Sequence, residues 1–116
     1  MKINIIDIIK KKIAISTDDG KQVREVIIEL FDTDDEIEIS FDGISMLISH
    51  FLNESIGKLY IIYPKNRWDK LDNIIYTNIS KDDLDLLKTR VIPNYKDSLT
   101  DREKFENIQK DILKGI

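Results

Sequence analysis

Residues 37–60 read IEISFDGISMLISHFLNESIGKLY, and this stretch contains the two periodicities that decide the fold. Apolar and polar side chains alternate over residues 37–41, which is typical of a half-buried strand, and Gly43 closes it. From Ser49 onward the spacing of apolar residues becomes helical. The face expected to be buried carries Phe51, Leu52, Ser55, Ile56, Leu59, Tyr60 and Tyr63, whereas Asn53, Glu54 and Lys58 are expected to face away.

The chain before this stretch predicts two strands and a helix. An Ile-rich run over residues 3–9 ends at Lys10–Lys12, and Ile13 and Ile15 resume it, which indicates two short strands joined by a tight basic turn. Thr17 then supplies an N-cap, followed by first-turn acids at Asp18 and Asp19. Helical spacing predicts about four turns of amphipathic helix through Val23, Val26, Ile27, Leu30 and Phe31.

The chain after it predicts one more strand and two helices. Pro64 ends the central helix, residues 63–72 read as a polar connection that holds Trp68, and a strand follows over 74–79. Ser80 and Asp83 resemble a capping box for a helix with Leu84, Leu87 and Val91 that stops at Pro93. Thr100 and Glu103 form a capping box for a last helix with Phe105, Ile108 and Ile112.

The predicted order is therefore β-β-α-β-α-β-α-α. We expect an α/β fold with a mixed sheet of about four strands flanked by helices, since strands alternate with helices and the first two strands form a hairpin. Residues 1–116 should be one domain, with residues 95–116 as a C-terminal helical extension. The count of 23 Ile against one Ala also favours strands, because β-branched side chains suit them.

The composition excludes several classes of protein. The chain has no Cys, hence no disulfide, thiolate nucleophile or Cys-based metal site, and a cytoplasmic location fits best. A net charge of −4 argues against sequence-independent nucleic-acid binding, which needs clustered Lys and Arg. Asn4 and Asp7 interrupt the first apolar run, so it is neither a secretory signal nor a membrane span. We expect no cofactor, no metal and no membrane partner.

The central stretch also resembles the STAS-like domain family, the relatives of bacterial anti-sigma-factor antagonists. The resemblance lies in a strand that ends Phe41, Asp42, Gly43 and a helix that opens Phe51, Leu52, Asn53, Glu54 and continues to Gly57. It extends more weakly over most of residues 13–92. It implies a STAS-like fold and a non-catalytic regulatory module, of bacterial or phage origin, that binds a protein partner such as a histidine-kinase-like ATPase, an anti-sigma kinase.

The resemblance also implies how the partner is released. In these antagonists, phosphorylation of a Ser at the start of the second helix releases the partner, and an ungapped comparison places that position at His50, directly after Ser49. Ser49 is therefore the candidate phosphorylation site. The contact surface should lie in residues 43–54, because this loop and helix start follow the carboxyl end of a strand, where α/β sheets present their sites. The predicted partner-binding residues there are Met46, Ile48, Ser49, His50, Asn53 and Glu54.

Other interpretations of these residues remain open. Ser49 could simply cap the helix, in which case the switch is lost and only the binding surface remains. His50 could be an ordinary residue at a helix start, and hydrolysis is disfavoured because adjacent helical side chains point about 100° apart. An enzyme or a small-ligand sensor would need a concave polar pocket, which the sequence does not reveal. We therefore predict no catalytic residues.

A second hypothesis starts from the acidic segment 32–42, which has six acidic residues and no basic ones. An acidic inhibitor or decoy would use these charges against a basic surface of a host enzyme. The segment lacks the spacing of an EF-hand, so a solvated acidic turn is the simpler interpretation. Trp68 could anchor a partner or fold back over the core.

Overall fold

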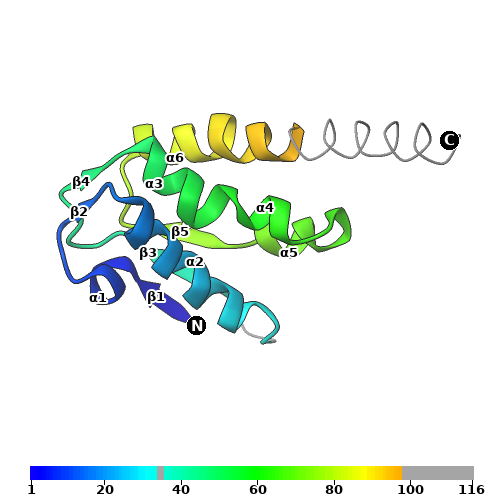
Figure 1. Ribbon diagram of the computed structural model, residues 1–116, viewed down its shortest axis with the longest axis horizontal. Coiled ribbons are helices and arrows are strands. Elements are labelled where there is room, and N and C mark those ends of the chain that lie inside the picture. Colours follow the sequence, from blue (N-terminus) through cyan, green and yellow to red (C-terminus); the bar gives the residue numbers. More distant parts are fainter. Residues whose placement is uncertain (34–35, 98–116) are drawn as a thin grey trace, which may run out of the picture.

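The computed structural model describes residues 1–33 and 36–97 and has β3 (Glu38–Ser40) at the centre of a three-stranded sheet. Strand β1 (Lys2–Asn4) lies on one side of β3 and β5 (Ile75–Thr77) on the other. Both pairings are parallel, with Ile39 level with Ile3 and Tyr76. The α/β class with small sheets flanked by helices is confirmed. Figure 1 shows α2 (Thr17–Phe31), α3 (Ser49–Leu52) and α4 (Leu59–Ile62) beside the strands.

The predicted initial hairpin is wrong. Residues Ile5–Ile9 form a helix, α1, and β2 (Ile13–Ala14) pairs in parallel with β4 (Met46–Leu47) in a separate two-stranded sheet. Ile5 and Ile9 are both buried and lie one helical turn apart, so packing overrides the strand preference of Ile in this run. All strand pairs in the described ranges are therefore parallel, whereas the hairpin would have made the sheet mixed.

Helix α2 (Thr17–Phe31) is confirmed, with its N-cap one residue earlier than predicted. The Ser16 hydroxyl oxygen accepts a hydrogen bond from the Asp19 backbone amide at 3.1 Å. The predicted apolar face packs inward, with Val23, Ile27 and Phe31 fully buried. Because a helix of this length has several backbone amides without partners at its start, the cap fixes where α2 begins.

The central helix begins at Ser49 and ends before Pro64, as predicted. It consists of α3 (Ser49–Leu52), the π-helical turn η1 (Asn53–Gly57) and α4 (Leu59–Ile62). A π turn contains more residues than an α turn, so side chains beyond Leu52 are rotated relative to a regular 3.6-residue repeat. This rotation explains why Glu54, predicted to face away, is buried. Tyr63, also predicted to be buried, is half-buried, and the other residues predicted for the inner face are all buried: Phe51, Leu52, Ser55, Ile56, Leu59 and Tyr60.

The segment after Pro64 is helical rather than an open polar connection. It forms a short 3-10 helix, η2 (Lys65–Arg67), and then α5 (Trp68–Asp72). The Trp68 ring lies edge-on to the Tyr60 ring at 5.8 Å, and its indole N–H lies 3.2 Å from the backbone carbonyl oxygens of Tyr60 and Tyr63. Trp68 therefore folds back onto the core and fixes this segment.

The last described helix continues past the proline that was expected to stop it. Ser80 caps α6 (Lys81–Leu86) by accepting from the Asp83 amide, as predicted, and a second π turn, η3 (Leu87–Val91), leads into helical residues 92–97. Pro93 has no N–H to donate to the preceding turn, and its ring crowds that turn. A π turn directly before the proline accommodates both effects, so the helix continues. The capping box at Thr100 and Glu103, the helix with Phe105, Ile108 and Ile112, and most of the 95–116 extension lie outside the described residues.

Within the described ranges, no helix has both the length and the apolar character required to span a bilayer.

Candidate interaction surface

The structure exposes four of the six predicted partner-binding residues. Met46 and Ile48 lie in and beside β4, and Ser49 and His50 begin the central helix. Asn53 is half-buried and Glu54 is buried, so neither belongs fully to the outer surface. The predicted surface is therefore centred on β4 and the start of α3.

Two further apolar residues, which sequence reasoning did not assign to this surface, lie beside Met46 and Ile48. Ile13 and Ile15 flank the buried Ala14 and so point to one side of β2, and the register pairs Ile13 with Met46. These side chains form one exposed apolar face, here called the ribbon face, at Ile13 (42% exposed), Ile15 (42%), Met46 (53%) and Ile48 (42%). The Ile-Ala-Ile alternation was its signal in the sequence, but the assumed hairpin hid it.

The start of the central helix is tied to α2 by a side-chain contact. The Thr17 hydroxyl oxygen lies 2.6 Å from Nε2 of His50, which joins the first turns of two helices. Ser49 is the first residue of α3, and Ile48 occupies the N-cap position without a side-chain cap. Ser49 is exposed and its hydroxyl has no partner among the described residues, so it does not act as the cap that one interpretation required.

Glu54 joins α2 to the central helix instead of facing a partner. Its carboxylate lies 2.9 Å from Nζ of Lys58 and 3.5 Å from Nη1 of Arg24, and Arg24 also donates to the Glu54 backbone carbonyl at 2.6 Å. Burial alone would raise the pKa of Glu54, but Lys58 and Arg24 outweigh it and hold the pKa below its ordinary value. Glu54 is therefore an ionised group built into the packing of the two helices.

The basic segment Lys10–Lys12 fixes the position of β2 and does not form a hairpin turn. Lys10 ends α1 in a left-handed conformation with φ 58°, and the Lys12 carbonyl accepts from the Ser45 amide at 2.8 Å. Nζ of Lys11 lies 2.8 Å from the buried Asp19 carboxylate, and this hydrogen bond lowers the pKa of Asp19. The segment thus holds β2 beside β4 and anchors it to α2.

Part of the acidic segment 32–42 is already paired within the chain. Asp32 accepts from the Arg67 guanidinium at 2.7 Å, and Glu38 accepts from the Thr77 hydroxyl at 2.8 Å and lies 3.9 Å from Nζ of Lys2. In the part of the chain that the structure describes, no group of three or more Asp, Glu or His residues is arranged to hold a metal ion. Asp34 and Asp35 lie outside the described residues.

The fold and this surface define a small α/β domain in which a strand–loop–helix unit presents the exposed residues. Residues 19–84 match the family described as a STAS-like domain of unknown function (DUF4325), and the chain belongs to this family. The resemblance seen in the sequence is therefore confirmed. STAS-like domains are in general non-catalytic, and membership of this family indicates a regulatory module. No curated protein and no solved structure matches the chain significantly.

Proposed function

We propose that this protein is a non-catalytic regulatory module of bacterial or phage origin that acts in the cytoplasm. It binds an ATPase-fold kinase through the ribbon face and the start of α3. The observation that carries the proposal is the ribbon face itself. It places together four exposed apolar side chains from β2, β4 and the residue that follows each strand, and such grouped exposure is typical of protein-binding surfaces, unlike single scattered residues.

Ser49 supplies a means of release at the edge of this face. Its hydroxyl is exposed and without a partner among the described residues, so a kinase could reach it without breaking the fold. A phosphate there would add about 1.5 to 2 negative charges directly after Ile48. Since Ile48 belongs to the ribbon face, that charge would have to be desolvated in any complex that covers the face, which opposes binding.

The acidic-decoy hypothesis has less support. Asp32 and Glu38 already have partners within the chain, so their charges are not wholly available to a basic host surface. The two hypotheses differ in salt dependence, because exposed charge–charge contacts weaken with ionic strength whereas apolar contacts do not. Salt therefore forms part of the test.

The test compares two exposed isoleucines. Three proteins are used as baits, with and without ATP: the wild type, Ile48→Asp and the matched control Ile62→Asp. Ile62 is 50% exposed on α4 and lies outside the ribbon face. A kinase recovered in this way is then purified and titrated against each protein by calorimetry. We expect an ATPase-fold kinase to bind the wild type and Ile62→Asp but not Ile48→Asp, and to stay bound at about 0.5 M salt. Equal binding to Ile48→Asp, or loss in salt, would contradict the proposal.

A further inference from the structure

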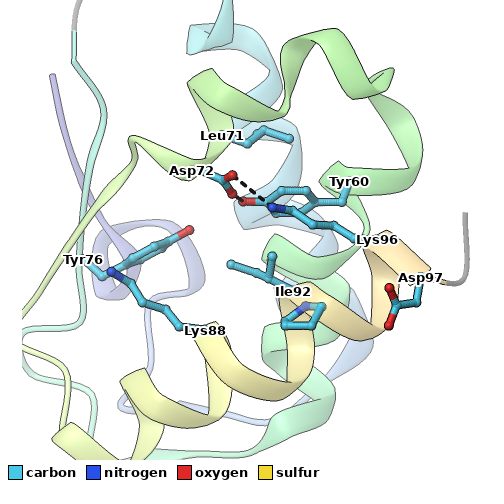
Figure 2. Close-up of a pocket in the computed structure, with 9 residues that line it drawn as sticks. Tyr60, Leu71, Asp72, Tyr76, Lys88, Ile92, Lys96 and Asp97 are labelled. Atoms are coloured by element: carbon cyan, nitrogen blue, oxygen red, sulfur yellow. Dashed lines mark hydrogen bonds and ion pairs between the residues drawn. The ribbon is translucent and has the colours of Figure 1, made fainter. Parts of the chain in front are cut away.

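A pocket of about 350 Å³ lies between β5, α5 and the helix of residues 81–97. It shares no residue with the ribbon face, and Figure 1 shows α5 and the ribbon strands β2 and β4 towards opposite sides of the molecule. Its volume is within the range of pockets that bind small molecules. The lining residues shown in Figure 2 include Tyr60, Leu71, Asp72, Tyr76, Lys88 and Ile92.

Asp72, on one wall of this pocket, has partners for both carboxylate oxygens. The Tyr60 hydroxyl donates to Oδ1 at 2.7 Å, and Nζ of Lys96 lies 2.9 Å from Oδ2. The Lys96 ammonium also lies 5.3 Å from the centre of the Tyr60 ring and 5.4 Å from that of Trp68. The negative charge of Asp72 is therefore compensated within the wall, so it does not by itself select a cationic ligand.

Tyr76 and Lys88 differ from this paired set. The hydroxyl oxygen of Tyr76 is buried and has no hydrogen-bond partner among residues 1–33 and 36–97, and Figure 2 shows it directed into the space between Asp72 and Ile92. Lys88 lines the same pocket and is exposed, and Figure 2 shows its ammonium group beside the Cβ end of the Tyr76 side chain, a ring length from the hydroxyl. Burial raises the pKa of Tyr76, so its hydroxyl keeps its proton and can donate. A buried polar group without a partner is unusual and needs an explanation.

We propose that this pocket binds a small organic carboxylate, which accepts from the Tyr76 hydroxyl, pairs with Lys88, and lays an apolar body against Leu71 and Ile92. An anion satisfies the unpartnered donor, and the exposed side chain of Lys88, on the wall of the same pocket, is long enough to turn its ammonium group to that anion. Asp97 also lines the pocket, but Figure 2 shows it at the opposite rim from Tyr76. The apolar wall distinguishes an organic acid from inorganic phosphate, which has no apolar body.

The test uses benzoate and three comparison probes, each titrated into the full chain by amide NMR and calorimetry. Benzyl alcohol and benzylamine keep the ring but replace the anion with a neutral or a cationic group, and inorganic phosphate keeps the anion but lacks the ring. We expect benzoate to bind best and to shift amides of β5 and of the helix of residues 81–97. Equal binding of any comparison probe, or no shift with millimolar benzoate, would overturn the proposal.

Two variants test the assigned contacts. Tyr76→Phe and Lys88→Gln should each weaken benzoate binding by about tenfold or more, whereas Lys81→Gln, on the same helix but outside the pocket lining, should not. Because the Tyr76 hydroxyl has no partner in the part of the chain that the structure describes, Tyr76→Phe should leave the unfolding midpoint unchanged or higher. A Tyr76→Phe variant that unfolds more easily yet binds benzoate normally would assign the hydroxyl a structural role instead.

Discussion

Gly20 and Glu54 lie so close that a Cβ atom placed on Gly20 would be 2.7 Å from the Cβ of Glu54. The same atom would lie 3.3 Å from the Phe51 carbonyl oxygen. Helix α2 therefore touches the backbone of the central helix at this point, and η1 packs against α2 along this contact. Only a residue without a side chain allows the two helices to approach this closely.

The first prediction concerns this contact. Gly20→Ala should destabilise the protein by about 1 to 3 kcal/mol, because overpacking outweighs the better helix propensity of Ala. Urea denaturation would measure the free energy of unfolding. Lys21→Ala, at the exposed neighbouring position of α2, is the control and should change it by less than about 0.5 kcal/mol. A more stable Gly20→Ala protein would show that the helices can separate at no cost.

The second prediction concerns the charges beside that contact. Glu54→Gln should cost about 3 kcal/mol, because it leaves the half-buried Arg24 guanidinium without its carboxylate. Since the folded pKa of Glu54 is lowered from 4.5, its contribution is complete above that value and is lost as the pH falls through the folded pKa. Urea curves from about pH 6 to pH 3 should therefore converge for the two proteins. A constant difference across this range would contradict the assignment.

The third prediction tests the central strand. Ile39 is fully buried in β3, so Ile39→Ala should cost about 2 to 5 kcal/mol. Ile75, which is 41% exposed in the neighbouring strand β5, offers the matched control, and Ile75→Ala should cost less than about 1 kcal/mol. Thermal unfolding of both variants would measure the difference. Similar losses at the two positions would mean that the sheet does not bury Ile39 as described.

The fourth prediction concerns release of the partner and rests on the proposed function. Ser49→Asp should fold normally but lose the kinase, because a charge beside Ile48 opposes burial of the ribbon face. Ser49→Ala should keep both its stability and its binding, since Ser49 is not the N-cap of α3. Circular dichroism and calorimetric titration would check the two properties. Unchanged affinity of Ser49→Asp would place the interface elsewhere.

The features that followed from the sequence are those set by one strong local pattern. Alternation around Ile39 predicted β3, the spacing from Val23 to Phe31 predicted α2, and Pro64 correctly marked the end of the central helix. In each case the signal, a periodicity or a proline, acts within a few residues and does not depend on what packs against the segment.

The features that were missed depend on distant residues. The burial of Ile5 and Ile9 made α1 a helix, and the two π turns moved Glu54 inward and carried a helix through Pro93. The ribbon face forms only because β2 pairs with a strand far along the chain. The pocket beside Tyr76 likewise joins a strand to the helices on either side of it in sequence, so no single segment could indicate it.

The strand pairings within the two sheets also set an order of events during synthesis. Strands β1 and β2 are made before the strands with which they pair, because β3 and β4 follow only after the whole of α2. Residues 1–14 therefore leave the ribosome with no strand partner, while α2 can form from local contacts. Parallel pairings of this kind close long loops and slow the folding transition. We infer that the Ile-rich residues 3–15 lack their strand partners until residue 47 has emerged, and that this exposure favours aggregation during that interval.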